Sequence, residues 1–119
     1  MANDFKRYTK ANVTTSTGTS SDAVYTVPST GSVAMEAVCI GIYLSNTGTT
    51  GITSDVFLDA YNGASYDIYV VKNATVPAGS TLEAISGGKL VVQGDGVTND
   101  AIKISSSTAS ALDATISVL

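Results

Sequence analysis

The chain is 119 residues long, with 44% hydrophobic residues, 13% charged residues and a formal net charge of −4 at pH 7. This length fits one domain, and the high apolar content with few charges argues against a disordered chain. There is no histidine and only one cysteine, Cys39, which excludes Ser-His-Asp and Cys-His catalytic sites, histidine-ligated zinc and a disulfide within the chain. We therefore expect a protein that is not an enzyme and that needs no cofactor.

The charges are distributed unevenly along the chain. Residues 1–10 carry three basic side chains against one acidic side chain, a net charge of +2, whereas residues 11–119 carry three lysines against nine acidic residues, a net charge of −6. An acidic body lacks the clustered Lys and Arg that nucleic acids need. The longest apolar stretch, residues 38–44, is too short to span a bilayer, and the N-terminus lacks the apolar segment of a signal peptide. We expect neither a nucleic-acid partner nor a membrane partner.

The chain divides into three parts. Residues 1–12 are predicted to form an extended, basic N-terminal arm, and residues 13–22, which are mostly Thr, Ser and Gly, a flexible link. Residues 23–119 alternate between polar and apolar side chains, a pattern typical of strands. The predicted strands are residues 23–27, 34–44, 53–61, 66–71, 81–85, 89–93, 101–105 and 112–119. Turns every eight to twelve residues separate them, so the sequence predicts an all-β protein, a single antiparallel β-sandwich or jelly-roll-like domain of about eight short strands.

Two of these segments carry further expectations. Strict alternation in residues 34–44 divides the strand into two faces, with Val38, Ile40, Ile42 and Leu44 on one and Cys39, Gly41 and Tyr43 on the other. Cys39 has no basic neighbour to activate it and is expected to be a buried, small hydrophobic residue. Asn62 and Gly63 both tolerate positive φ and predict a hairpin turn.

Aromatic residues are candidates for contacts with a partner. Phe57 and Tyr69 are predicted on the outward faces of neighbouring strands, which makes them candidates for a subunit interface. The tyrosines of this region, Tyr25, Tyr43, Tyr61, Tyr66 and Tyr69, suit protein contacts, carbohydrate stacking or packing within the domain, and the sequence leaves these alternatives open. Leu119 ends an apolar strand that pairs either within the domain or with a neighbouring subunit.

The N-terminal arm is the second candidate binding element. Its predicted contact residues are Phe5, Lys6, Arg7, Tyr8 and Lys10. Two aromatic anchors among basic residues favour an arm that docks on an acidic neighbour or on an exposed sheet edge. The same residues also suit a first strand of the domain itself.

The acidic residues indicate no metal site. Asp95, Asn99 and Asp100 share one loop, but their spacing departs from the EF-hand pattern, and an ordinary hairpin loop uses the same residue types. Asp55 and Asp59 lie about 13 Å apart along one strand face, too far apart for most glycosidase pairs. We assign them to a solvated sheet face and predict neither a metal site nor catalytic residues.

The order of several short segments resembles a known group of proteins. These segments are Asp4-Phe-Lys-Arg-Tyr-Thr9, Tyr25-Thr-Val-Pro28, Lys72-Asn-Ala-Thr-Val-Pro-Ala-Gly-Ser-Thr-Leu82, Gly88-Lys-Leu-Val-Val92, Ile102-Lys-Ile-Ser-Ser106 and Leu112-Asp-Ala-Thr-Ile-Ser-Val-Leu119. In this order they resemble small all-β virion structural proteins of tailed bacteriophages. The resemblance covers most of the chain, although the loop 94–100 is longer than in the group.

The resemblance implies a particle protein without enzymatic activity, in the virion and assembled in the cytoplasm of a bacterial host. The leading expectation is a capsid decoration (cement) protein that binds the major capsid protein and itself, as a homotrimer, and stabilises the shell. The alternatives are a neck, tail or fibre-associated structural module that binds neck or tail proteins, and a carbohydrate-binding β-sandwich module. Scarce charge and a mean hydropathy of +0.24 are compatible with a small protein that forms extensive interfaces.

Overall fold

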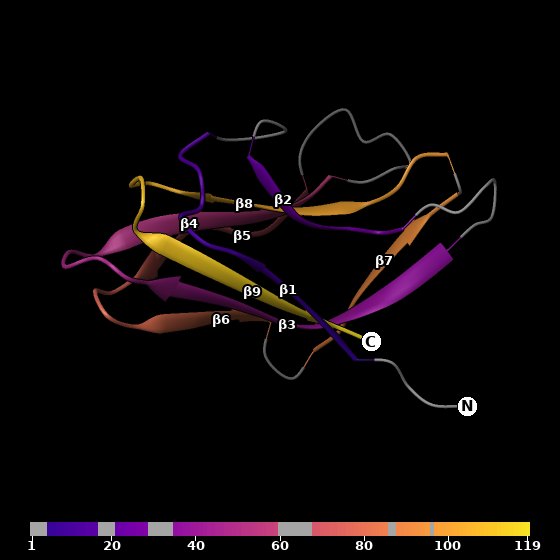
Figure 1. Ribbon diagram of the computed structural model, residues 1–119, viewed down its shortest axis with the longest axis horizontal. Helices are drawn as coiled ribbons and strands as arrows, with labels where there is room; N and C mark the ends of the chain where they lie inside the picture. The colour runs from indigo at the N-terminus through magenta and orange to yellow at the C-terminus, as the bar shows by residue number, and fades with distance from the viewer. Residues whose placement is uncertain (1–4, 17–20, 29–34, 60–67, 86–87, 96) are drawn as a thin grey trace.

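The computed structural model describes residues 5–16, 21–28, 35–59, 68–85, 88–95 and 97–119. Within these residues the protein is all-β (Figure 1). The described residues form nine strands: β1 (Lys6–Lys10), β2 (Asp22–Thr26), β3 (Met35–Asn46), β4 (Ile52–Asp59), β5 (Ile68–Val76), β6 (Thr81–Ile85), β7 (Leu90–Gly94), β8 (Ala101–Ser106) and β9 (Leu112–Val118). Strands β2 to β9 match the eight predicted strands in order, and β1 is additional. The predicted turn at Asn62-Gly63 lies outside the described residues.

The strands form two antiparallel sheets. Sheet A has the order β1-β9-β3-β6, and β7 pairs with the other half of β3. Sheet B has the order β2-β8-β4-β5. Figure 1 shows β1, β9, β3 and β6 in one layer and β2, β8, β4 and β5 in the other. The predicted antiparallel β-sandwich is therefore confirmed.

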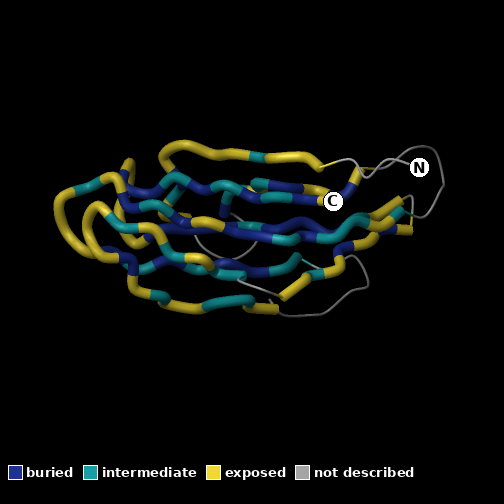
Figure 2. Tube along the Cα trace, turned by 90° about the horizontal axis from the view of Figure 1, so that it is seen from below, coloured by how far each residue is buried: buried dark blue, intermediate teal, exposed yellow. Residues whose placement is uncertain are grey.

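The core lies between the two sheets, where each strand turns its apolar positions inward. Strand β9 shows the period-two rule fully, because Leu112, Ala114, Ile116 and Val118 are buried and the residues between them are half-buried. Sheet B faces them with a second set of fully buried side chains, Val56, Ile102 and Ile104. Figure 2 shows the buried segments enclosed between exposed outer segments. Burying one such side chain stabilises the fold by about 1.5–3 kcal/mol.

A bulge in β3 makes the predicted assignment of its faces wrong. The pairing with β9 shifts register between Cys39 and Gly41, so that β3 has one extra residue at this point. A bulge interrupts strict alternation, and Cys39 therefore points into the same core as Ile42 and Leu44. Tyr43 stays on the outer face, where its ring covers Gly41: a Cβ there would lie 3.1 Å from the Tyr43 Cε2.

The N-terminal residues belong to the sandwich. Strand β1 pairs with β9 in an unbroken register from Lys6 opposite Val118 to Lys10 opposite Ala114. Val13, at the start of the predicted flexible link, is 0% exposed, and its N–H donates a hydrogen bond of 2.8 Å to the Leu112 carbonyl. The sequence left two alternatives open for this segment, a docking arm and a first strand of the domain. The pairing with β9 shows that β1 is a strand of the domain.

Candidate interaction surfaces

Strand β1 forms one edge of sheet A. Among the described strands it pairs only with β9. Residues directly opposite each other in a sheet point to the same face. Lys6, Tyr8 and Lys10 therefore point to the core side of the sheet, and Arg7 and Phe5 to its outer side. Apart from Tyr8, these five residues are exposed.

Tyr8 joins β1 to the opposite sheet. Its ring lies 4.5 Å from that of Tyr25 on β2, at an interplanar angle of 49°. Tyr25 is 4% exposed, and its burial, followed by the proximity of Tyr8 and Cys39, raises the pKa of its phenol. The predicted contact residue Tyr8 is thus half-buried and positions β1 on the body of the domain.

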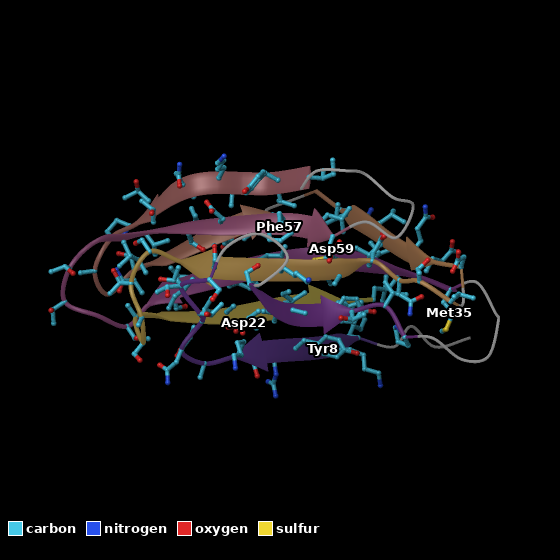
Figure 3. All side chains as sticks on the ribbon, turned by 90° about the horizontal axis from the view of Figure 1, so that it is seen from above. Tyr8, Asp22, Met35, Phe57 and Asp59 are labelled. Carbon is cyan, nitrogen blue, oxygen red and sulfur yellow. The ribbon has the colours of Figure 1, made fainter. Side chains whose placement is uncertain are left out.

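The predicted interface pair Phe57 and Tyr69 does form, but Phe57 is not on the surface. The two residues lie opposite each other on β4 and β5, with ring centroids 5.8 Å apart. Phe57 lies outside the main core cluster, as predicted from its alternation, yet it is only 1% exposed. The prediction that the Phe57 side chain lies on the surface, where another subunit could contact it, is therefore wrong. Figure 3 shows Phe57 and Asp59 along the same strand, β4.

The neighbours of Phe57 explain how a residue opposite the core becomes buried. Tyr69 flanks it on one side, and Lys103 of β8 is its partner on the other. The Lys103 ammonium lies 2.9 Å from the Asp59 carboxylate, which holds its long side chain along the sheet face. Tyr69 is 37% exposed, and the Lys72 ammonium lies 4.8 Å from its ring centroid.

Tyrosines on the described strands therefore make contacts within the domain. Packing within the domain was one of the three alternatives that the sequence left open. Tyr8 pairs with Tyr25, Tyr69 pairs with Phe57, and Tyr43 covers Gly41. Tyr61 and Tyr66 lie outside the described residues. Internal pairing of this kind leaves fewer ring faces for stacking on a sugar.

Leu119 lies at the end of sheet A. Its N–H donates to the Val38 carbonyl at 2.8 Å, and its carbonyl accepts from the Val38 N–H at 3.3 Å. The last strand is therefore paired within the domain, on both sides, by β1 and β3. The Leu119 side chain remains 39% exposed, so it stays a candidate contact residue.

Acidic side chains in the candidate metal loop bind backbone groups. Asp95 accepts hydrogen bonds from the N–H groups of Val97 and Thr98 at 2.9 and 2.8 Å. These bonds lower the pKa of the Asp95 carboxyl. Asp100, 4% exposed, accepts from the Gln93 N–H at 2.9 Å. The carboxylates close the loop that connects β7 of sheet A to β8 of sheet B. No group of three His, Cys, Asp or Glu that could hold a metal is present among the described residues.

Asp55 has a similar structural role in sheet B. Its carboxylate accepts a 2.6 Å hydrogen bond from the N–H of Asn73, which has a positive φ of 52°. The β4–β5 register shifts at this point. Asp55 thus fixes a bulge in the edge strand β5, and bulges discourage the pairing of an edge with another chain.

Gly94 is required by the packing of this loop. It forms a bridge with Asn99, and a Cβ at Gly94 would collide with the Asn99 Oδ1 and lie 2.9 Å from its Cγ. We expect Gly94→Ala to lower the free energy of unfolding by about 2 kcal/mol, since the neighbour includes backbone that must shift. Urea denaturation measures this effect. Gly51→Ala is the matched control, because nothing lies within 4 Å of a Cβ there; equal losses in the two variants would contradict the packing argument.

Cys39 is buried, as predicted. It is 0% exposed, and its Sγ lies 3.6 Å from the Gly41 carbonyl. Burial raises the pKa of the Cys39 thiol, which keeps it protonated and unreactive. The residue therefore serves as core.

An exposed valine and its half-buried neighbour were missed by the sequence analysis. Val91 is 57% exposed on β7, and its partner Val38 on β3 lies on the same outer face. The sequence does carry a signal for this exposure. In a strand, the three consecutive apolar residues Leu90, Val91 and Val92 cannot all face the core, so at least one must point away from it. The cross-strand neighbour of Val91 depends on register, which the sequence does not provide.

In comparisons with known proteins, no family model, curated protein or solved structure matches this chain. Among the described residues no helix is long and apolar enough to cross a membrane. The sequence and the surfaces described above are therefore the basis for assigning a function.

Proposed function

We propose that the chain is a non-enzymatic structural protein of a tailed-phage virion. In this role it is a decoration (cement) protein that binds the major capsid protein on the outside of the shell, associates with copies of itself and stabilises the particle. The order of sequence segments that resembles small virion proteins supports this proposal, and so does a compact antiparallel sandwich with short connections. Assembly takes place in the cytoplasm of the bacterial host.

The observation that carries the proposal is the basic edge at β1. Its side away from β9 has no partner strand among the described residues, and an exposed edge can accept an extended segment of another protein through main-chain hydrogen bonds. Arg7 and Lys10 are exposed on this strand, whereas residues 11–119 carry a net charge of −6. The charge contrast favours an acidic segment of the shell over a second β1 strand, which would repel it.

A structural role also fits the hydrogen bonds that the acidic side chains make. Asp55, Asp95 and Asp100 accept hydrogen bonds from backbone N–H groups. Carboxylates held in this way stabilise turns and bulges, and the proposal assigns them no chemical step. A neck or tail module with the same fold is the competing assignment, and the number of copies on the particle separates the two.

Binding to shells tests the proposed function. Purified chain is added to shells that lack it, and the bound amount is measured by co-sedimentation and the thermal disruption of the shells by light scattering. We expect saturable binding at hundreds of copies per shell and a higher disruption temperature. Shells that bind no chain, or that bind it without gaining stability, would contradict a cement role.

A further inference from the structure

A row of apolar side chains crosses the outer face of sheet A. Val38 on β3 lies between two neighbours, Leu119, to which it is hydrogen-bonded through both main-chain groups, and Val91 on β7, its register partner. Cys39 and Val92, next in sequence to Val38 and Val91, are buried in the core. Because successive residues of a strand point to opposite faces, Val38 and Val91 point outward.

The row continues onto β1. Val118 is buried in the core, so Leu119 points outward. Val118 lies opposite Lys6, and one further step of the same register places Phe5 beside Leu119. Phe5, Leu119, Val38 and Val91 thus form one stripe over four strands, here called the apolar stripe. Figure 1 shows the C-terminus at this end of the sandwich, near β1, β3 and β7.

The apolar stripe is solvent-exposed in the single chain. Phe5 is 67% exposed, Val91 57% and Leu119 39%. Together they offer on the order of 300 Å² of apolar surface, the size of the largest patch on a typical monomer, which is often functional. Exposure of apolar surface to water is unfavourable in free energy. A partner that covers the stripe removes this unfavourable contribution.

Charged residues flank the apolar stripe unequally. On the side toward the middle of the strands lie the exposed Arg7 and Lys89, both basic. On the other side lie the exposed Glu36 and its partner Gln93. The stripe therefore has a basic border and an acidic border, and a partner needs the reverse arrangement.

We propose that the apolar stripe binds the same stripe on a second copy of this chain, face to face, around a two-fold axis that runs along the stripe. Such an axis exchanges the two borders, so that Gln93 of each copy faces Lys89 of the other, and Glu36 lies beside that lysine on the neighbouring strand. All four apolar residues then remain in contact with apolar residues. The basic border of each copy thus meets the acidic border of the other. The surface as a whole is self-complementary, as a two-fold interface requires.

The alternative two-fold axis, perpendicular to the stripe in the same plane, is unfavourable. It would place Phe5 over Val91 of the other copy and Arg7 over Lys89, which brings like charges together. The charge pattern therefore selects one arrangement. A two-fold contact closes at two copies, so the inference gives a dimer in place of the homotrimer expected from the sequence.

The contact is small. Its apolar area falls at the low end for specific complexes, so we expect a dissociation constant in the micromolar to millimolar range. On a shell, where neighbouring copies are held close together, a weak contact of this kind becomes effective through high local concentration. The inference deepens the proposed function and rests on its self-association.

Sedimentation velocity of the purified chain, without shells, tests the dimer and separates its failure from a failure of shell binding. The wild-type chain is measured from about 10 μM to about 1 mM, the range in which a weak dimer forms. We expect Val91→Asp to raise the dissociation constant at least tenfold. The matched control is Val97→Asp, which places the same charge at a valine that is 77% exposed but lies in the β7–β8 loop; it should change the constant less than twofold.

A charge exchange tests the two-fold arrangement without altering the stripe. Glu36→Lys should weaken the dimer, and Lys89→Glu added to it should restore the wild-type constant. Circular dichroism verifies that each variant is folded. A wild-type chain that stays monomeric over the whole range overturns the proposal. So does a Val91→Asp variant that dimerises as well as Val97→Asp, or a double variant that remains as weak as Glu36→Lys.

Discussion

Phe57→Ala should lower the free energy of unfolding by about 3 kcal/mol or more, a large part of the 5–15 kcal/mol that holds a domain of this size together. The side chain is 1% exposed and packs against the ring of Tyr69. Its removal loses apolar burial and leaves a cavity that the pleated strands of sheet B cannot fully close. Urea denaturation, monitored by circular dichroism, measures the loss.

The other phenylalanine of the chain provides the control. Phe5 is 67% exposed, and Phe5→Ala should change the free energy of unfolding by less than about 0.5 kcal/mol at a concentration where the chain is monomeric. A small effect at Phe57, comparable to that at Phe5, would mean that Phe57 is a surface residue. It would then return to the list of interface candidates.

Neutralising the basic residues of β1 should weaken binding to shells about tenfold, because two charges at the rim of an interface each contribute on the order of 0.5–1 kcal/mol. The variant is Arg7→Thr with Lys10→Thr, since threonine is well accommodated in strands. Deletion of the arm is a poorer experiment, because β1 pairs with β9 and Tyr8 packs on Tyr25. Binding is measured by co-sedimentation at several salt concentrations, and the variant should show the weaker salt dependence.

Lys72→Glu is the matched control for this variant. Both variants change the net charge of −4 to −6, but Lys72 lies on β5, at the far edge of sheet B. Lys72→Glu should therefore leave shell binding nearly unchanged. An equal loss in both variants would show that total charge matters and that β1 has no special part in binding.

Strand content was predictable because it depends on local patterns. Residues 112–119 alternate without interruption, and the structure buries every second residue of β9 from Leu112 to Val118. Cys39 was predicted as buried because an unactivated cysteine among apolar residues is usually core. These inferences need only the period of a strand.

Features that depend on register or on neighbouring strands were not predictable. The bulge in β3 brings Cys39 and Ile42 into one core, although they differ by an odd number of positions. Phe57 alternates outward, yet Tyr69 and Lys103 flank it on the adjacent strands. The apolar stripe joins residues that are up to 114 positions apart in the chain, from Phe5 to Leu119, and only the order of strands in sheet A reveals it.

The number of copies of this chain per virion tests the proposed function most directly. Purified virions are digested, and the chain is quantified by mass spectrometry against the major capsid protein. Hundreds of copies per particle are the result expected of a shell decoration protein. A handful, as at a unique vertex, would place the chain in the neck or tail, and its absence from the particle would contradict the virion assignment altogether.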